Sequence, residues 1–115
     1  MTAYALAHLH AGSSHADVFA YMERIQATMD PFGGRFVIHG AEVEVVEGSW
    51  PGHVVLIEFP DRAQVRAWYE SPAYQEILPL RTDHIPADLI FVDGVGPDYN
   101  AAGTAAKARE AAARG

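Results

Sequence analysis

The sequence contains no cysteine, few basic residues and no long apolar run, and each absence excludes a class of protein. Without cysteine the chain has neither a disulfide framework nor a thiol nucleophile, which is typical of a reducing compartment. No stretch approaches the roughly 20 apolar residues that a membrane span needs. The first ten residues lack the basic segment that opens a signal peptide. We therefore expect a cytoplasmic protein with no membrane partner.

Basic side chains are scarce. The 115 residues hold 8 lysines and arginines against 15 aspartates and glutamates, for a net charge of −7. Residues 1–95 carry 13 of the acidic groups and only 5 of the basic ones. An acidic body repels phosphate backbones, so we expect no nucleic-acid partner. Half of the residues are apolar, and this length provides one domain with a modest core.

The N-terminal third predicts a strand followed by a helix. Residues 3–10 alternate between a bulky face and a face that is nearly all alanine, which indicates a strand with something packed closely on the alanine side. Ser14 is placed to cap a following helix, which ends before Pro31 and the glycine pair after it. We expect that helix to bury one apolar stripe, formed by Val18, Met22, Ile25 and Met29.

Three further strands follow. Residues 35–47 predict a long strand with a bulge at Gly40, and residues 53–59 return as its hairpin partner. Residues 87–95 predict the last strand. The hairpin and the final strand are separated by a helical region.

The region between the hairpin and the last strand is predicted to contain two helical segments. Asp61 caps the first, and Ser71-Pro72 restarts the helix with a serine cap and a proline in the first turn. Trp68 falls on the inner face, where core packing is the favoured interpretation. Pro79 removes a backbone donor, so we expect it to end or kink the second segment.

The order β-α-β-β-α-β predicts an α+β, ferredoxin-like fold: a four-stranded antiparallel sheet with the helices on one face. The bare face of this sheet would expose apolar residues from all four strands, and a domain of residues 1–95 cannot cover it alone. We therefore expect a homodimer in which two such faces meet.

Residues 96–115 form a tail outside this domain. The segment begins with Gly96-Pro97 and continues as an alanine-rich stretch with no large apolar side chain. Helix propensity is high there, but the segment has little to pack with. We expect a frayed helix or a disordered tail.

Several short motifs of the domain occur together in a known family. They are Gly33-Gly34-Arg35, Glu47-Gly48, Trp50, Glu58-Phe59-Pro60, Trp68-Tyr69, Ser71-Pro72, Tyr74 and Arg81. Through these motifs, over about residues 3–95, the domain resembles the uncharacterised bacterial family known as domain of unknown function 1330, which belongs to the dimeric α+β barrel superfamily. The family often has arginine where His39 stands, and serine where Asp61 stands. The resemblance implies a dimeric barrel without a settled activity, in a superfamily of cofactor-free monooxygenases, isomerases, haem-handling proteins and stress-responsive dimers.

The candidate site residues are a few aromatics, arginines and histidines. The Ser71-Pro72 break predicts a gap between helix and sheet, with Tyr69 and Tyr74 on its two sides. Arg81 and Arg35 are candidate clamps for a carboxylate, and the alternative is an ordinary ion pair, for Arg81 with Glu70, Glu76 or Asp83. Trp50 lies in the hairpin turn, either as a cap over the sheet edge or as a subunit contact.

His8 and His10 form a His-x-His pair on one strand face. This spacing can bind a metal with one more ligand, but no carboxylate lies nearby in the sequence. The favoured interpretation is two polar side chains at a strand end or at the dimer seam, and we expect no metal. We place both residues near a substrate rather than a metal. We also expect no cofactor.

Two hypotheses of function follow. In the first, a cleft binds or transforms a small aromatic or carboxylate-bearing metabolite. In its enzymatic form a histidine, His39, takes a proton from the substrate, and Tyr69, Tyr74 and Arg81 orient the substrate. In the second, the protein is a non-catalytic dimeric binding or interaction module. Convergence of four or more of these polar groups on a cavity of at least roughly 300 Å³ favours the first hypothesis.

Overall fold

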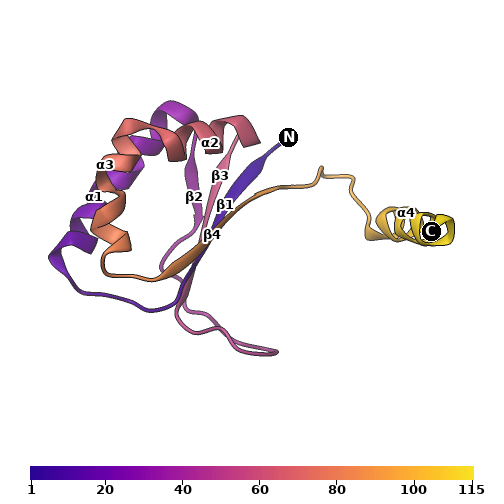
Figure 1. The fold of residues 1–115 in the computed structure, drawn as a ribbon, viewed down its shortest axis with the longest axis horizontal. Coiled ribbons are helices and arrows are strands. Elements are labelled where there is room, and N and C mark those ends of the chain that lie inside the picture. The colour runs from indigo at the N-terminus through magenta and orange to yellow at the C-terminus, as the bar shows by residue number, and fades with distance from the viewer.

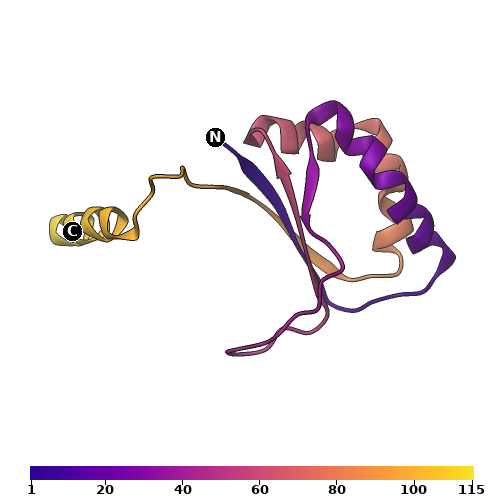
Figure 2. The ribbon, with the colours of Figure 1, turned by 180° about the vertical axis from the view of Figure 1, so that it is seen from behind.

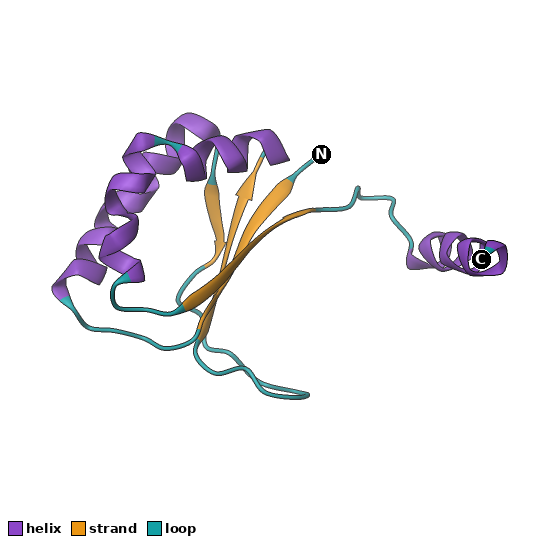
Figure 3. Cartoon of the chain, viewed as in Figure 1, coloured by secondary structure: helices purple, strands orange, loops and turns teal.

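The computed structural model describes all 115 residues and confirms the α+β, ferredoxin-like fold (Figure 1). The four strands form one antiparallel sheet in the order β2-β3-β1-β4, and α1, α2 and α3 lie on one face of it (Figure 3). A single 3₁₀ turn, Asp30–Phe32, follows α1. In chain order the elements are β1 Ala3–Leu9, α1 Ala16–Met29, β2 Arg35–Ile38, β3 His53–Phe59, α2 Arg62–Glu70, α3 Pro72–Thr82, β4 Ala87–Asp93 and α4 Ala101–Arg114.

Strand β1 lies at the centre of the sheet and separates two different faces. Its alanine side faces the helices, where Ala3 and Ala5 are buried. The bulky side faces away from the helices, where Leu6 pairs with Leu56 of β3 and with Ile90 of β4. Ile90 is 52% exposed, so the middle of this outer face is apolar and uncovered in the single chain.

The core lies where α2 and the start of α3 meet the sheet. Trp68 is 1% exposed, and its indole N–H donates to the Thr28 hydroxyl at 3.0 Å. That hydroxyl donates in turn to the carbonyl of Ile25 at 2.6 Å, so the buried polar atoms are satisfied within the core. The core assignment of Trp68 is therefore confirmed. The largest fully buried side chains are Trp68, Tyr74, Phe59, Met29, Ile77 and Val65.

Helix α1 is rotated relative to the prediction. Met22 is 47% exposed, whereas Tyr21 is buried in the position expected for the methionine. Tyr21 finds a hydrogen-bond partner across the helix interface, which fixes its hydroxyl in the core. The cap also differs: Nδ1 of His15, not Ser14, accepts the backbone N–H of Asp17 at 3.0 Å.

The predicted strand over residues 35–47 was wrong beyond Ile38. Ile38 pairs with Leu56, and only three residues of β3 remain beyond that position for any further pairing. Gly40 then takes a φ of 77°, in the left-handed region outside regular strand geometry. The irregularity in the pairing with β3 falls between Phe36 and Ile38 and not at Gly40, where the bulge was predicted. Residues 39–52 instead form an irregular arm that projects beyond the sheet (Figure 1).

The arm returns to the sheet at a tight contact. Gly52 has a φ of 91°, and a Cβ at this position would stand 1.8 Å from the carbonyl oxygen of Leu9. Glycine is required there for both reasons.

Pro79 lies inside the second helical segment and does not end it. Helix α3 begins after the Ser71 cap, whose hydroxyl accepts the Tyr74 N–H at 3.3 Å, and continues to Thr82. Pro79 and the residue one turn before it, Gln75, are both exposed. The carbonyl of Gln75 that the proline leaves without a donor therefore faces water, which reduces the penalty of a proline inside a helix.

The tail contains helix α4, which stands apart from the domain in both views (Figures 1 and 2). None of its residues is buried. Asn100 caps its first turn by accepting the Ala102 N–H at 2.8 Å. The division between a domain of residues 1–95 and an independent tail stays a prediction. No helix of the chain is both long and apolar enough to cross a membrane.

Candidate functional site

A cavity of about 290 Å³ lies between the inner face of the sheet and the pair of helices α1 and α3. Of its 23 lining residues, 17 are hydrophobic. On the sheet side it is lined by short side chains, including Ala5 and Ala7 of β1 and Ala87 of β4. These alanines leave the space open, because a larger side chain at the same positions would project into it. The alanines of β1 therefore have two roles: Ala3 and Ala5 allow close packing of the helices, and Ala5 and Ala7 leave room for the cavity.

The polar corner of this cavity consists of Tyr21, Tyr74 and Arg81. The hydroxyls of Tyr21 and Tyr74 are hydrogen-bonded to each other at 2.8 Å, and both residues are buried. The guanidinium carbon of Arg81 lies 5.9 Å from the centre of the Tyr21 ring, a cation–π distance. All three side chains line the cavity.

Arg81 has no carboxylate partner. The predicted alternative, an ion pair with Glu70, Glu76 or Asp83, is not formed, and Glu76 instead lies 3.6 Å from Arg24. Three of the domain's five arginines form ion pairs, and Arg66 lies over the ring of Phe91. Arg81 is therefore a half-buried cation that faces an apolar cavity without a protein anion to balance it.

The electrostatics of the corner keep both tyrosines neutral and the arginine charged. Burial raises the pKa of Tyr21 and of Tyr74 above the usual 10.0, although the nearby charge of Arg81 acts in the opposite direction. Burial alone would lower the pKa of Arg81, but its interactions with the two tyrosines outweigh this effect and raise the pKa. At neutral pH the corner thus offers one permanent positive charge and a phenol pair.

His39, which lines the cavity with Tyr74 and Arg81, stacks on Phe36 with ring centres 4.6 Å apart. Tyr69 does not line the cavity. Its ring packs 5.5 Å from that of Tyr74, and it faces a second, more open depression between α2, the first turns of α3 and the edge strand β4.

Arg35 is not brought to the cavity either. Its guanidinium forms an ion pair with Glu58 at 2.7 Å, its cross-strand partner from β3. By strand alternation this pair belongs to the outer face of the sheet.

His8, His10 and Trp50 form a separate cluster, away from the cavity. The His8 ring lies between His10, at 4.4 Å, and Trp50, at 3.9 Å. Trp50 reaches this position from the end of the arm, so it caps the end of β1 within its own chain. The assignments of His8, His10 and Trp50 to substrate binding stay predictions.

Two polar residues of the cavity were missed by the sequence reasoning. Tyr21 lies outside the apolar stripe predicted for this helix, and the only signal for it was its position three residues after Val18 and four residues before Ile25, both of which are buried. His53, the first residue of β3, also lines the cavity. Of the four residues expected to line the cleft, three do so and Tyr69 does not. With the two additions, the titratable side chains that line the cavity are Tyr21, His39, His53, Tyr74 and Arg81.

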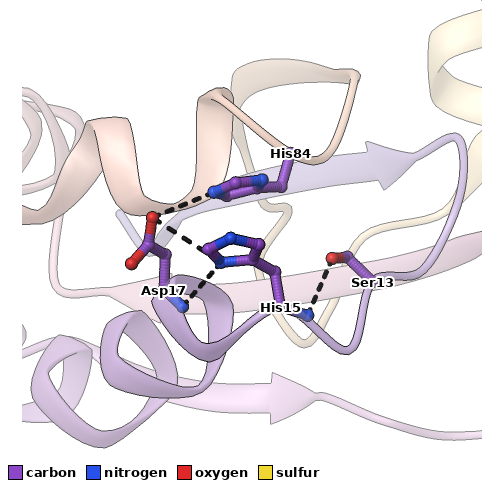
Figure 4. Close-up of polar contacts among 4 residues, drawn as sticks. All are labelled: Ser13, His15, Asp17 and His84. Atoms are coloured by element: carbon purple, nitrogen blue, oxygen red, sulfur yellow. Dashed lines mark hydrogen bonds and ion pairs between the residues drawn. The ribbon is translucent and has the colours of Figure 1, made fainter.

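A further histidine cluster connects the start of α1 with the end of α3 (Figure 4). Asp17 accepts a hydrogen bond from Nε2 of His84 at 3.0 Å, and the rings of His15 and His84 stack at 3.8 Å. The backbone N–H of His15 donates to the hydroxyl of Ser13 at 3.1 Å. Because Ser13 and the neighbour of His84, Ile85, line the cavity, this cluster fixes the helices at its rim.

Comparison with known proteins agrees with the fold. Residues 2–95 match the model of a family described as a domain of unknown function, DUF1330. Among curated proteins no relative was found by sequence. A protein of unknown function from Rhodopseudomonas palustris has a similar structure, with 19% identity over 84% of each chain and a TM-score of 0.65.

Two other solved structures share the fold at lower similarity. SnoaB from Streptomyces nogalater, described as a cofactor-independent oxygenase, has a TM-score of 0.54, with 14% identity over 86% of this chain and 96% of that chain. A dimeric ferredoxin-like protein of unknown function from Jannaschia also has a TM-score of 0.54, with 16% identity over 82% of this chain and 100% of that chain.

Proposed function

Because this chain belongs to the DUF1330 family, whose function is unknown, we infer its role from its own residues. We propose that it binds a small carboxylate-bearing metabolite with an apolar or aromatic body. The observation that carries this proposal is Arg81, a cation on an apolar cavity with no protein carboxylate beside it. Arginine presents a planar fork that matches a carboxylate in two parallel hydrogen bonds. The apolar lining fits a ring or a short hydrocarbon body.

The Tyr21–Tyr74 pair would orient the bound ligand through a hydrogen bond. One hydroxyl donates to the other, which leaves one O–H of the pair available for a ligand oxygen. The ligand would therefore place its carboxylate at Arg81 and its apolar part over the alanine floor formed by Ala7 and Ala87.

Turnover of this ligand is the enzymatic form of the proposal. His39 and His53 both line the cavity, and histidine is the side chain suited to proton transfer near neutral pH. In this form a histidine removes a proton while Arg81, Tyr21 and Tyr74 hold the substrate. Tyr69 lies outside the cavity and acts only by packing on Tyr74. A ligand-binding module without chemistry is the alternative.

We also propose that the working form is a homodimer joined through the outer face of the sheet. Ile90 and Val92 of β4 are 52% and 42% exposed on that face, beside the partly buried Leu6. Apolar surface of this extent is rarely left open in a soluble monomer. One of the structures with a similar fold is itself described as dimeric.

The binding proposal is tested by thermal shift with matched pairs of ligands. Benzoate and phenylacetate carry the carboxylate, while benzamide and phenylacetamide have the same body without the charge. We expect the acids alone to raise the melting temperature, and Arg81→Met to weaken their binding at least about tenfold. Arg66→Met is the matched control, because Arg66 also lacks a carboxylate partner but lies outside the cavity.

Two results would contradict the binding proposal: equal stabilisation by the neutral amides, or an equal loss of binding in the Arg66→Met variant. The enzymatic form has its own test. His39→Gln and His53→Gln should retain ligand binding while at least one of them loses turnover of a ligand identified in the screen. If both variants turn over such a ligand normally, the histidines have no part in chemistry.

A further inference from the structure

On the outer face of the sheet, the carboxylate of Asp88 lies beside the His8 and His10 side chains. Asp88 of β4 lies directly opposite His8 in the strand register, and its Oδ2 lies 2.8 Å from Nε2 of His10. One possible ligand atom from each of His8, His10 and Asp88 lies within 4.8 Å of the others. The third ligand that the sequence could not locate thus comes from the neighbouring strand, 78 residues further along the chain than His10.

The ring of His8 is held in the form that a metal ligand needs. Its Nε2 lies 2.6 Å from the carbonyl oxygen of Pro51. A carbonyl can only accept, so Nε2 must carry the proton, and the lone pair of the neutral ring is then on Nδ1. Metal-binding histidines commonly donate their other N–H to a carbonyl in this way, which fixes the tautomer and the ring orientation. Trp50 stacks on the same ring at 3.9 Å and restricts it further.

The separation of the other two ligands also fits. Ligand atoms about 2.0–2.1 Å from a tetrahedral zinc ion stand about 3.3 Å from each other. The 2.8 Å separation between His10 and Asp88 needs only a small opening to reach this value. In the single chain both side chains are accessible, with 35% and 75% of their side-chain area exposed, so an ion can replace the proton between them.

The second histidine cluster, His15, Asp17 and His84, also holds its possible ligand atoms within 4.8 Å of one another, but it differs in how its rings are used and oriented (Figure 4). Nδ1 of His15 already accepts the backbone N–H of Asp17, so its lone pair is used in capping α1. The rings of His15 and His84 are stacked with planes only 19° apart, so their in-plane lone pairs run side by side instead of converging. His8 and His10 are inclined by 36°.

We propose that His8, His10 and Asp88 bind one divalent transition-metal ion of the zinc class per chain. Two imidazoles and one carboxylate suit such an ion and leave a fourth position for water or an exogenous ligand. The bound ion would join β1, β4 and, through the Pro51 carbonyl, the end of the arm at residues 39–52. This site is separate from the Arg81 cavity and does not depend on the ligand proposed there.

The test uses the full chain without a histidine tag, treated with a chelator and then titrated with zinc alone against a chromophoric competitor. We expect one zinc ion per chain. His10→Ala and Asp88→Asn should each weaken binding at least about tenfold, the scale seen even for indirect partners of a metal ligand. His84→Asn, in the second histidine cluster, should change the affinity less than twofold.

A measurement on the unaltered protein covers any variant that fails to fold. Zinc should shift the ring ¹⁵N signals of His8 and His10 in NMR spectra and leave those of His15 and His84 in place. The proposal is overturned if zinc binds no better than to the His8→Ala/His10→Ala double variant, if His84→Asn removes the binding, or if the ring signals of His15 and His84 are the ones that move.

Discussion

The hydrogen bond between Tyr21 and Tyr74 gives a sharp prediction about stability. The two residues are 9% and 1% exposed, so neither hydroxyl can easily exchange its partner for water. Replacing one tyrosine by phenylalanine leaves the other hydroxyl buried without its partner, at a cost of about 1–3 kcal/mol. Arg81 interacts favourably with both hydroxyls, which places the expected loss toward the lower part of this range, at about 1–2 kcal/mol.

The double variant should behave differently from the sum of the single ones. With both hydroxyls removed, no buried group lacks a partner, and we expect Tyr21→Phe/Tyr74→Phe to lose less than about 1 kcal/mol. The coupling energy of the cycle is then at least about 1 kcal/mol. Tyr69→Phe is the matched control, since the Tyr69 hydroxyl makes no hydrogen bond within the chain, and it should change stability by less than about 0.5 kcal/mol.

Urea unfolding followed by circular dichroism measures all four variants. The protein concentration is kept constant, because the stability of a dimer depends on it. Equal slopes with denaturant concentration would show that only the stability has changed. Additive losses in the double variant would refute the reasoning, because they would mean that the hydroxyls do not depend on each other.

The remaining predictions concern pH, charge, assembly and the tail. Because burial raises the pKa of Tyr21 and Tyr74 in the folded chain, the unfolded chain loses these protons first; stability should fall as the pH rises above about 10, and the double phenylalanine variant should fall less steeply in alkaline urea titrations. Arg81→Met should leave the melting temperature of the ligand-free protein within about 4 °C of the original, because relief of a half-buried cation offsets the lost cation–π contact; a larger drop would show that Arg81 serves the fold. Ile90→Asp should convert the dimer to a monomer in light-scattering measurements, and an unchanged mass would exclude the outer face as the interface. Deletion of residues 97–115 should leave the melting temperature nearly unchanged, and a marked loss would show that α4 docks on the domain.

The order of the elements could be predicted because each is encoded locally. The alternation in β1, the serine and proline at the start of α3 and the glycines after α1 each act within a few residues. The end of β2 could not be predicted in the same way. A strand continues only while a neighbour offers residues to pair with, and the length available in β3 is not visible in β2.

The candidate site was predictable only in part, for a similar reason. The rotation of α1 that buries Tyr21 depends on Tyr74, which is 53 residues away along the chain. Of the three carboxylates that were candidates to pair with Arg81, Glu76 pairs instead with Arg24, which lies 52 residues away from it along the chain. The Ser71-Pro72 break did point to Tyr74, but it also placed Tyr69 on the cavity, whereas the Tyr69 ring packs against Tyr74 outside the cavity.

The alanine floor of the cavity has a consequence for how such a protein can change over generations. Alanine and valine codons differ by a single base, so Ala7 and Ala87 can each gain bulk in one mutational step. The added carbons would be buried, at about 0.8 kcal/mol of stabilisation per methylene where they fit without strain. The charge at Arg81 is untouched by such a step. The size and the charge of an acceptable ligand can therefore be altered independently, through different residues on opposite sides of the same cavity.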